Sequence, residues 1–133
     1  MAAMTRYLQK ALLDHALGIT AFTIPTELWG SLHTASPTES GSFDDEISDS
    51  GYSRQSIFGL MTETDLTSGT SQIDTVVNFG PADGDNGSVT YFAISDASSA
   101  GNMLLYGALA NSQTFDTNDQ FQLNPGQLII KFD

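Results

Sequence analysis

The stretch VTYFAISDASSAGNMLLYGAL, residues 89–109, decides the fold class because it contains two strand patterns joined by a turn. Val89–Ser95 is rich in the β-branched and aromatic residues that favour strands, and Met103–Leu109 is a second apolar segment. The residues between them, DASSAGN, favour a turn. The segment therefore predicts a strand, a turn and a second strand, while the pairing order of the strands stays open.

Further strand patterns occur on both sides of this segment. With its two strands included, the predicted strands are Leu28–Thr34, Tyr52–Leu60, Ile73–Phe79, Val89–Ser95, Met103–Leu109, Gln120–Leu123 and Gln127–Phe132. About seven short strands with frequent turns predict a mainly β protein. Its expected architecture is an antiparallel β-sandwich or jelly roll, and residues 1–133 are expected to form a single domain.

Residues 1–18 predict one amphipathic helix before the strands. Leu8, Leu12 and Ala16 repeat at helical spacing, and Gly18 is a natural C-terminal stop. Leu13 and Leu17 widen the apolar stripe. Asp14 and His15 interrupt it, so the segment is not a targeting signal, and no apolar run reaches the roughly 20 residues needed to span a bilayer. We therefore expect a soluble, unprocessed protein without a membrane partner.

The composition excludes several classes of function. The chain has no cysteine, which removes disulfides, iron–sulfur clusters, thiolate zinc sites and cysteine nucleophiles. Sixteen acidic residues against four basic ones give a formal charge of −12. Such a surface repels phosphate backbones, so no nucleic-acid partner is expected.

Residues 35–51 are rich in Ser, Asp and Glu and predict a long acidic loop. Its carboxylates, with two more in the turn cluster GPADGDNGS, are weak candidates for a hard cation such as Ca²⁺: Asp44, Asp45, Glu46, Asp49, Asp83 and Asp85. The turn cluster fails the EF-hand pattern at Gly87 and Ile94, and the loop matches no known ligand spacing. The expectation is a solvated loop with no metal and no cofactor.

Two histidines, His15 and His33, are the candidate bases for catalysis. No motif ties either of them to a serine nucleophile, so we expect the protein not to be an enzyme. A hydrolase stays a remote alternative that needs one histidine in a cleft beside a serine or a carboxylate. The aromatic residues Trp29, Tyr52, Tyr91, Phe92 and Tyr106 are candidates for a sugar-stacking platform, although strand aromatics usually pack in the core.

Several blocks in a fixed order carry a family resemblance. They are LLDHALG, LWGSLHT followed by SPTESG, GYSRQSI, a strand ending in NFG, VTYFAISDASSAGNMLLYGAL and NDQFQLNPGQLIIKFD. This pattern resembles a family of small tailed-bacteriophage virion proteins, often labelled phage tail fibre or structural proteins. The chain departs from the family pattern at DDEISDS, where the family has a Gly-rich stretch, and at DGDNG, where it often has a tryptophan.

The resemblance implies a non-enzymatic component of the virion, assembled in the host cytoplasm. One compact domain without a shaft favours a capsid-decorating (cement) protein, expected to be a homotrimer that binds the major capsid protein and stabilises the shell by mass action. The alternative is a tail-fibre or baseplate module that contacts tail proteins or a host glycan. The residues expected at interfaces are Arg6, Tyr7, Lys10, His15, Trp29, Tyr52 and Arg54, although Arg54 could instead pair with the acids of its own loop.

Overall fold

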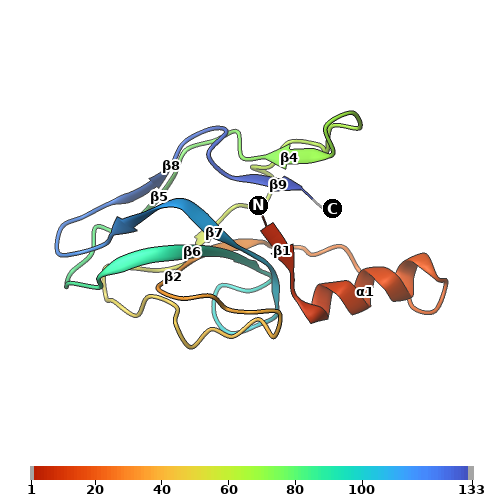
Figure 1. The fold of residues 1–133 in the computed structure, drawn as a ribbon, viewed down its shortest axis with the longest axis horizontal. Helices are drawn as coiled ribbons and strands as arrows, with labels where there is room; N and C mark the ends of the chain where they lie inside the picture. Colours follow the sequence, from red (N-terminus) through yellow and green to blue (C-terminus); the bar gives the residue numbers. More distant parts are fainter. Residues whose placement is uncertain (1, 132–133) are drawn as a thin grey trace.

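The computed structural model describes residues 2–131, which contain nine strands and one helix (Figure 1). In chain order the elements are β1 Ala2–Met4, α1 Arg6–Ala16, β2 Trp29–His33, β3 Gln55–Ser56, β4 Thr70–Gln72, β5 Val77–Phe79, β6 Ser88–Ser95, β7 Met103–Thr114, β8 Phe121–Leu123 and β9 Ile129–Lys131. Every strand pairing between them is antiparallel. The predicted mainly β fold with one N-terminal helix is confirmed.

The two strands predicted within residues 89–109 pair as an antiparallel hairpin and form the centre of a five-stranded sheet. Strand β6 pairs with β7, and the sheet order is β1-β7-β6-β2-β3. Strand β7 continues to Thr114, beyond the predicted end at Leu109, with a shift of register between Val89 and Tyr91 of β6. Such an irregularity bends a strand, and β7 is visibly curved along its length (Figure 1).

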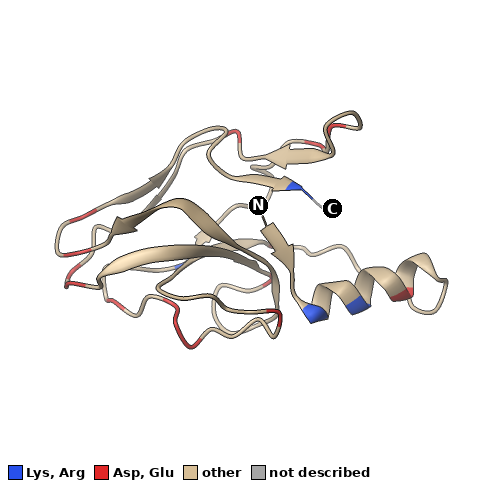
Figure 2. Ribbon diagram, in the orientation of Figure 1, with Lys and Arg blue, Asp and Glu red and all other residues tan. Residues whose placement is uncertain are grey.

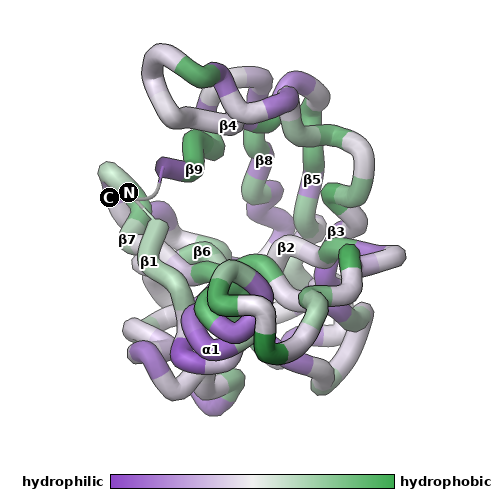
Figure 3. Tube along the Cα trace, turned by 90° about the vertical axis from the view of Figure 1, so that its right-hand side faces the viewer, coloured by the Kyte–Doolittle hydropathy of each residue, from purple (hydrophilic) through white to green (hydrophobic). Residues whose placement is uncertain are grey.

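Two short ribbons, β4–β9 and β5–β8, form the second layer over one face of the sheet (Figures 1 and 3). Between the layers lies an aromatic core. Phe79 is fully buried and makes edge-to-face contacts with Phe92 and Phe121, at centroid distances of 6.2 and 5.9 Å. These contacts hold the ribbons to the sheet, because aromatic pairs add to the free energy of simple area burial. The jelly-roll connectivity stays a prediction.

Several elements differ from their predictions. The strand expected over Tyr52–Leu60 is reduced to β3, because the chain turns at Gly59, where φ is +77°, and the Leu60 amide bonds to the Ile57 carbonyl. The strand expected over Ile73–Phe79 is reduced to β5, and β4 was not predicted. The helix predicted over residues 1–18 begins only at Arg6, because residues 2–4 form β1, whose backbone pairs with Leu105–Gly107 of β7. A segment so short takes its conformation from its neighbour rather than from its own sequence.

The acidic loop of residues 35–51 is irregular, as predicted, but it is not a detached solvated segment. The Ile47 amide bonds to the Leu32 carbonyl, and the Thr34 amide bonds to the Asp45 carbonyl, at 2.9 Å in each case. Ile47 is buried in the core cluster. The loop therefore lies along the free edge of β2 and belongs to the folded body.

Helix α1 projects away from the two layers (Figure 1). Only Leu8 among its eleven residues is buried. After the helix, an irregular return segment runs back to β2, and we call residues 6–28 the N-terminal arm. Across residues 2–131, no helix has the length and the apolar character required to cross a membrane.

Candidate functional site: the N-terminal arm and the buried clusters of the body

Arg54 forms the centre of a buried polar cluster. Its guanidinium binds the Glu46 carboxylate in a bidentate manner, with Nε–Oε2 and Nη2–Oε1 distances of 2.8 Å. The side chain of Arg54 is 5% exposed and that of Glu46 is 15% exposed. The hydrogen bonds to Glu46 raise the pKa of Arg54 further above its ordinary value. The sequence left open whether Arg54 faces a partner or its own loop, and the structure places it against the loop.

The same guanidinium also fixes the turn between β6 and β7. Arg54 Nη1 donates to the carbonyl oxygens of Ala97 and Ala100, both at 2.9 Å. Within that turn, the Asp96 carboxylate accepts a hydrogen bond from the Asn102 amide at 2.8 Å. The GYSR block and the DASSAGN block, more than forty residues apart in sequence, therefore form one structural unit.

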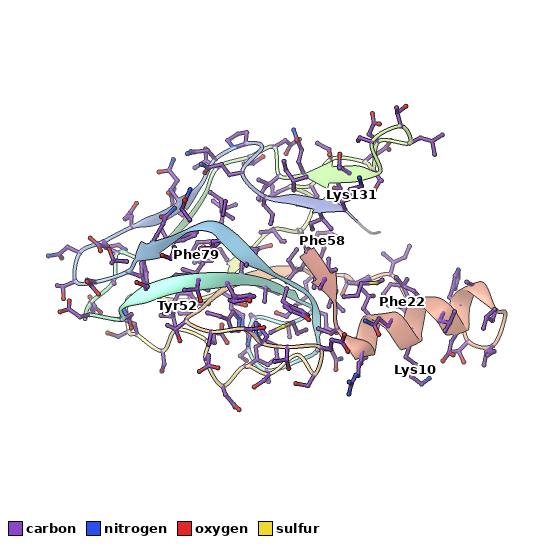
Figure 4. All side chains as sticks on the ribbon, viewed as in Figure 1. Lys10, Phe22, Tyr52, Phe58, Phe79 and Lys131 are labelled. Atoms are coloured by element: carbon purple, nitrogen blue, oxygen red, sulfur yellow. The ribbon has the colours of Figure 1, made fainter. Side chains whose placement is uncertain are left out.

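Tyr52 and Phe43 enclose this cluster. The Tyr52 hydroxyl donates to Glu46 at 2.9 Å and accepts from the Leu32 amide at 3.1 Å. Burial, followed by the charge of Glu46, raises the pKa of Tyr52 well above its usual range. Phe43 lies over the Arg54 guanidinium, 4.3 Å from it, in cation–π geometry. Tyr52 and Arg54, which were expected at an interface, are thus internal groups (Figure 4 labels Tyr52).

His33 is the fully buried histidine of the body. Its Nε2 lies 2.9 Å from the Ser31 hydroxyl, and both residues are inaccessible to solvent. Its Nδ1 has no hydrogen-bond partner. Burial lowers the pKa of His33 to about 4, so the ring is neutral at pH 7. A serine–histidine contact therefore exists, but it lies where a substrate has no access.

The carboxylates considered as cation ligands are used in separate local contacts. Asp49 accepts hydrogen bonds from the amides of Gly51, Asp83 and Gly84 and from the Asn86 side chain, and these contacts, led by the Asp83 amide, lower its pKa to about 2. The other candidates are dispersed: Glu46 binds Arg54, Asp83 accepts from Ser50, Asp85 accepts from Thr117, and Asp44 and Asp45 are exposed. Among residues 2–131, no three acidic, histidine or cysteine side chains are arranged to hold a metal ion.

The arm is anchored to the body at Thr5. This side chain is 1% exposed, caps helix α1 by accepting from the Leu8 amide at 3.4 Å, and donates to the Met103 carbonyl at 2.6 Å. The Thr5 amide also bonds to the Leu104 carbonyl at 3.0 Å. One residue therefore starts the helix and holds its first turn against β7.

The far end of the arm is closed by a Schellman motif that the LLDHALG block encodes. Gly18 has φ +74°, its amide bonds to the His15 carbonyl, and the Ile19 amide bonds to the Asp14 carbonyl at 2.8 Å. His15 Nδ1 then accepts the Phe22 amide at 3.0 Å, which fixes the return segment beside the helix. The tip of the arm is a defined structure, held by hydrogen bonds on both sides of the turn.

This defined structure presents large apolar side chains to solvent. The exposed fractions are 59% for Leu13, 65% for Leu17, 67% for Ile19 and 79% for Ile24. Figure 3 looks toward the tip and shows apolar segments, in green, alternating with polar ones along the arm. A cluster of exposed apolar residues on one element is typical of an interaction surface.

Charge is divided unevenly between the arm and the body. Within the arm, Arg6 and Lys10 balance Asp14 and Glu27. The whole formal charge of −12 therefore lies on the rest of the chain. In Figure 2 two basic residues mark α1, while acidic residues follow the loops of the body. The arm is therefore suited to approach a partner without net charge repulsion.

Four of the seven predicted interface residues lie together on the arm. Arg6 pairs with Glu39 at 3.3 Å, Lys10 pairs with Asp14, and Tyr7 and His15 are exposed. Trp29 is half-buried at the start of β2, and its indole donates to Glu27 at 2.8 Å. Figure 4 labels Lys10 and Phe22 on the arm.

The sequence prediction missed the role of Leu13, Leu17, Ile19 and Ile24. Leu13 and Leu17 widen the apolar stripe of the helix beyond the single face that Leu8 needs to reach the body. An apolar stripe wider than the surface that contacts the body indicates a second, exposed apolar surface on the helix, and this was the signal in the sequence. Two of the five candidates for a sugar platform, Tyr52 and Phe92, contribute instead to the core cluster.

The comparisons with known proteins agree with the resemblance in the sequence. A family model described as Podophage GP4 fiber I protein gp80 matches residues 3–131. No curated protein matches the chain. The match includes the arm, the Arg54 cluster and all nine strands apart from the first residue of β1. The chain therefore belongs to the podophage GP4 fiber I protein gp80 family, a family of phage fibre-type structural proteins.

Proposed function

We propose that this protein is a non-enzymatic structural component of a podophage virion, built into a fibre at the tail through its N-terminal arm. The observation that carries the proposal is the arm itself. It leaves the body as an ordered helix and exposes Leu13, Leu17, Ile19 and Ile24, which a partner would bury. Covering such side chains gives about 25 cal/mol per Å² of apolar surface removed from water.

A role without catalysis is supported by the positions of the two histidines. His33 and Ser31 have no exposed surface. His15 is exposed, but its Nδ1 accepts the Phe22 amide and serves the fold of the arm. Neither side chain is placed as a general base beside an accessible nucleophile.

Capsid decoration is the second candidate function, with the major capsid protein as partner and a homotrimer as the assembly. It is supported by the two-layer β body, which has no fibrous repeat among residues 2–131. In this role the arm would bind the assembled shell and stabilise it in proportion to its binding free energy. Both candidates use the same surface and differ in the location of the protein in the virion.

Electron microscopy of intact virions with an antibody against the body separates the two candidates. Labelling restricted to tail fibres supports the first proposal, and labelling over the head overturns it in favour of decoration. The copy number gives an independent answer. A dozen or so copies per particle agree with a fibre, whereas hundreds of copies require the head lattice.

A further inference from the structure

An apolar crevice of about 200 Å³ lies between the sheet and the β4–β9 ribbon. Its walls come from β6 and β7 on one side and from residues 127–130 on the other, and all fourteen residues that line it are uncharged. Its large apolar side chains include Phe92, Leu105, Leu109, Leu128, Ile129 and Ile130. Ile129, at the mouth, is 48% exposed. In a chain that carries sixteen acidic residues, an opening without charge is suited to an apolar ligand.

The arm cannot fill the crevice of its own chain. Ala2 of β1 lines the crevice, and β1 leads directly into α1 through the anchored residue Thr5. From that point the helix runs away from the body, so that Leu17 and Ile19 lie at the far end of the arm (Figure 1). The hydrogen bonds of the helix cap and of His15 hold it in this direction.

We infer that the tip of the arm, at Leu17 and Ile19, inserts into the β7–β9 crevice of a second copy of this chain. Within residues 2–131, two apolar surfaces of matching character have no partner, and each is out of reach of the other. An occupant of an uncharged crevice on a body of charge −12 has to be apolar and free of net negative charge, and the arm of a second copy, residues 6–28, meets both conditions. The inference deepens the proposed function and rests on it for the gathering of several copies in one fibre.

The arm needs little reorganisation to bind in this way. The Schellman turn at Gly18 and the His15–Phe22 contact already fix the backbone that presents Leu17 and Ile19. A preorganised segment loses little conformational entropy on binding, so more of its burial free energy appears as affinity. The contact is between two different surfaces, so copies can close into a ring or exchange arms in pairs.

Analytical ultracentrifugation of the purified full chain tests the inference. The wild type should self-associate, and Leu17→Asp and Ile129→Asp, one in each surface, should each raise the dissociation constant roughly 100-fold. Leu66→Asp is the matched control, because Leu66 is 99% exposed on the body and adds the same charge outside both surfaces. Thermal unfolding, measured at a concentration at which the wild type is monomeric, should change little in all three variants, since none of these side chains is buried.

Mixing the two variants gives a sharper result. Leu17→Asp retains its crevice and Ile129→Asp retains its arm, so together they should form a dimer through one intact contact, although neither associates alone. A wild-type chain that stays monomeric, or an oligomer that survives either substitution, overturns the inference. So does a mixture that remains monomeric.

Cysteine cross-linking identifies the contact directly, because the chain has no cysteine of its own. A double variant with Leu17→Cys and Ile129→Cys should form disulfide-linked dimers and larger species, and Leu66→Cys with Ile129→Cys should not. Equal cross-linking of both pairs contradicts the inference. Labelling of the head in electron microscopy would overturn the fibre proposal but would not change the association and cross-linking results. Failure of the proposed function can therefore be distinguished from failure of the inferred contact between copies.

Discussion

At the scale of single residues, Arg54 connects the acidic loop of residues 35–51 to the turn between β6 and β7. It binds Glu46, stacks on Phe43 and fixes the carbonyls of Ala97 and Ala100. These contacts lie between segments that the chain order keeps apart. A single long cation therefore replaces the apolar packing that a loop rich in Ser and Asp cannot supply.

Substitution of Arg54 by methionine should lower the free energy of unfolding by about 3–5 kcal/mol, because Glu46 then remains as an unpaired and largely buried carboxylate. Urea denaturation at pH 7 measures the effect. Arg6→Met is the matched control, since the Arg6–Glu39 pair is exposed and should change stability by less than about 1 kcal/mol. Adding Glu46→Gln to Arg54→Met should recover part of the loss. Equal destabilisation by Arg54→Met and Arg6→Met would contradict a structural role for this cluster.

Stability should also depend on the protonation of His33. Burial holds its pKa at about 4, against 6.5 for the free side chain, so the unfolded chain binds a proton that the folded protein rejects. The contribution of the neutral His33 ring to the free energy of unfolding is fully present above pH 6.5, and it is lost as the pH falls toward 4. At about 1.4 kcal/mol per pKa unit, the loss is about 3 kcal/mol.

The measurement is urea denaturation of the wild type and of His33→Asn at several pH values between 7 and 4. The difference between the two curves isolates His33 from the carboxylates that also titrate near the acidic limit. We expect that difference to shrink as the pH falls. Parallel curves would show that His33 is accessible to protons in the folded state.

For single residues, the sequence predicted the type of contact, such as an ion pair for Arg54, better than it predicted the residue on the other side of that contact. The pairing of Arg54 with its own loop was one of the two alternatives, and the loop contains four acids within six positions. Which acid turns inward depends on the alignment of Glu46 with His33 across the edge of β2. That alignment is set by tertiary packing, so local sequence could not identify it.

At the scale of elements, the arm combines two anchors with an exposed tip. Thr5 holds its base to β7, and Gly18 and His15 shape its end. The sequence predicted the helix and its stop at Gly18, since caps are local signals. It did not predict that the helix leaves the body, because an amphipathic stripe does not say whether its apolar face meets the same chain or a partner.

Replacement of Gly18 by alanine tests whether the tip is held as an ordered unit. A Cβ at this position meets no atom within 4 Å, so the cost is backbone strain at φ +74°, about 1–2 kcal/mol. Hydrogen exchange should quicken at the amides of Ile19 and Phe22, which the turn protects. Gly59→Ala is the matched control, with φ +77° and open space in a turn of the body, and should leave both amides unchanged. Unchanged exchange in Gly18→Ala would contradict the ordered tip.

Strand prediction succeeded for β6 and β7 but overestimated two alternating segments, Tyr52–Leu60 and Ile73–Phe79, of which only β3 and β5 pair. The β6–β7 hairpin carries its own pattern of apolar residues and turn residues. Strands β1 and β3 have three and two residues, too few for a period to be read, and they form because β7 and β2 offer open edges.

At the scale of the whole molecule, charge is separated between a neutral arm and an acidic body, and this separation is not evident from any short segment of the sequence. The total of −12 follows from composition, but its absence from residues 6–28 becomes meaningful once the structure shows that this segment projects. A neutral apolar arm on an acidic body limits self-association to contacts that the arm makes. Random contact between bodies is disfavoured by repulsion, which opposes aggregation.

The dependence of self-association on salt follows from this separation. An arm seated in an uncharged crevice is held by apolar burial, while the two acidic bodies repel at a distance. Raising the ionic strength from about 0.01 to about 0.15 M shortens the screening length from about 30 to about 8 Å, which weakens the repulsion and should strengthen association. Sedimentation of the wild type across this range gives the dissociation constants. If Arg6 and Lys10 instead held the copies together through ion pairs with a neighbouring acidic loop, added salt would weaken association. The sign of the salt effect therefore distinguishes burial of the tip from electrostatic docking of the helix base.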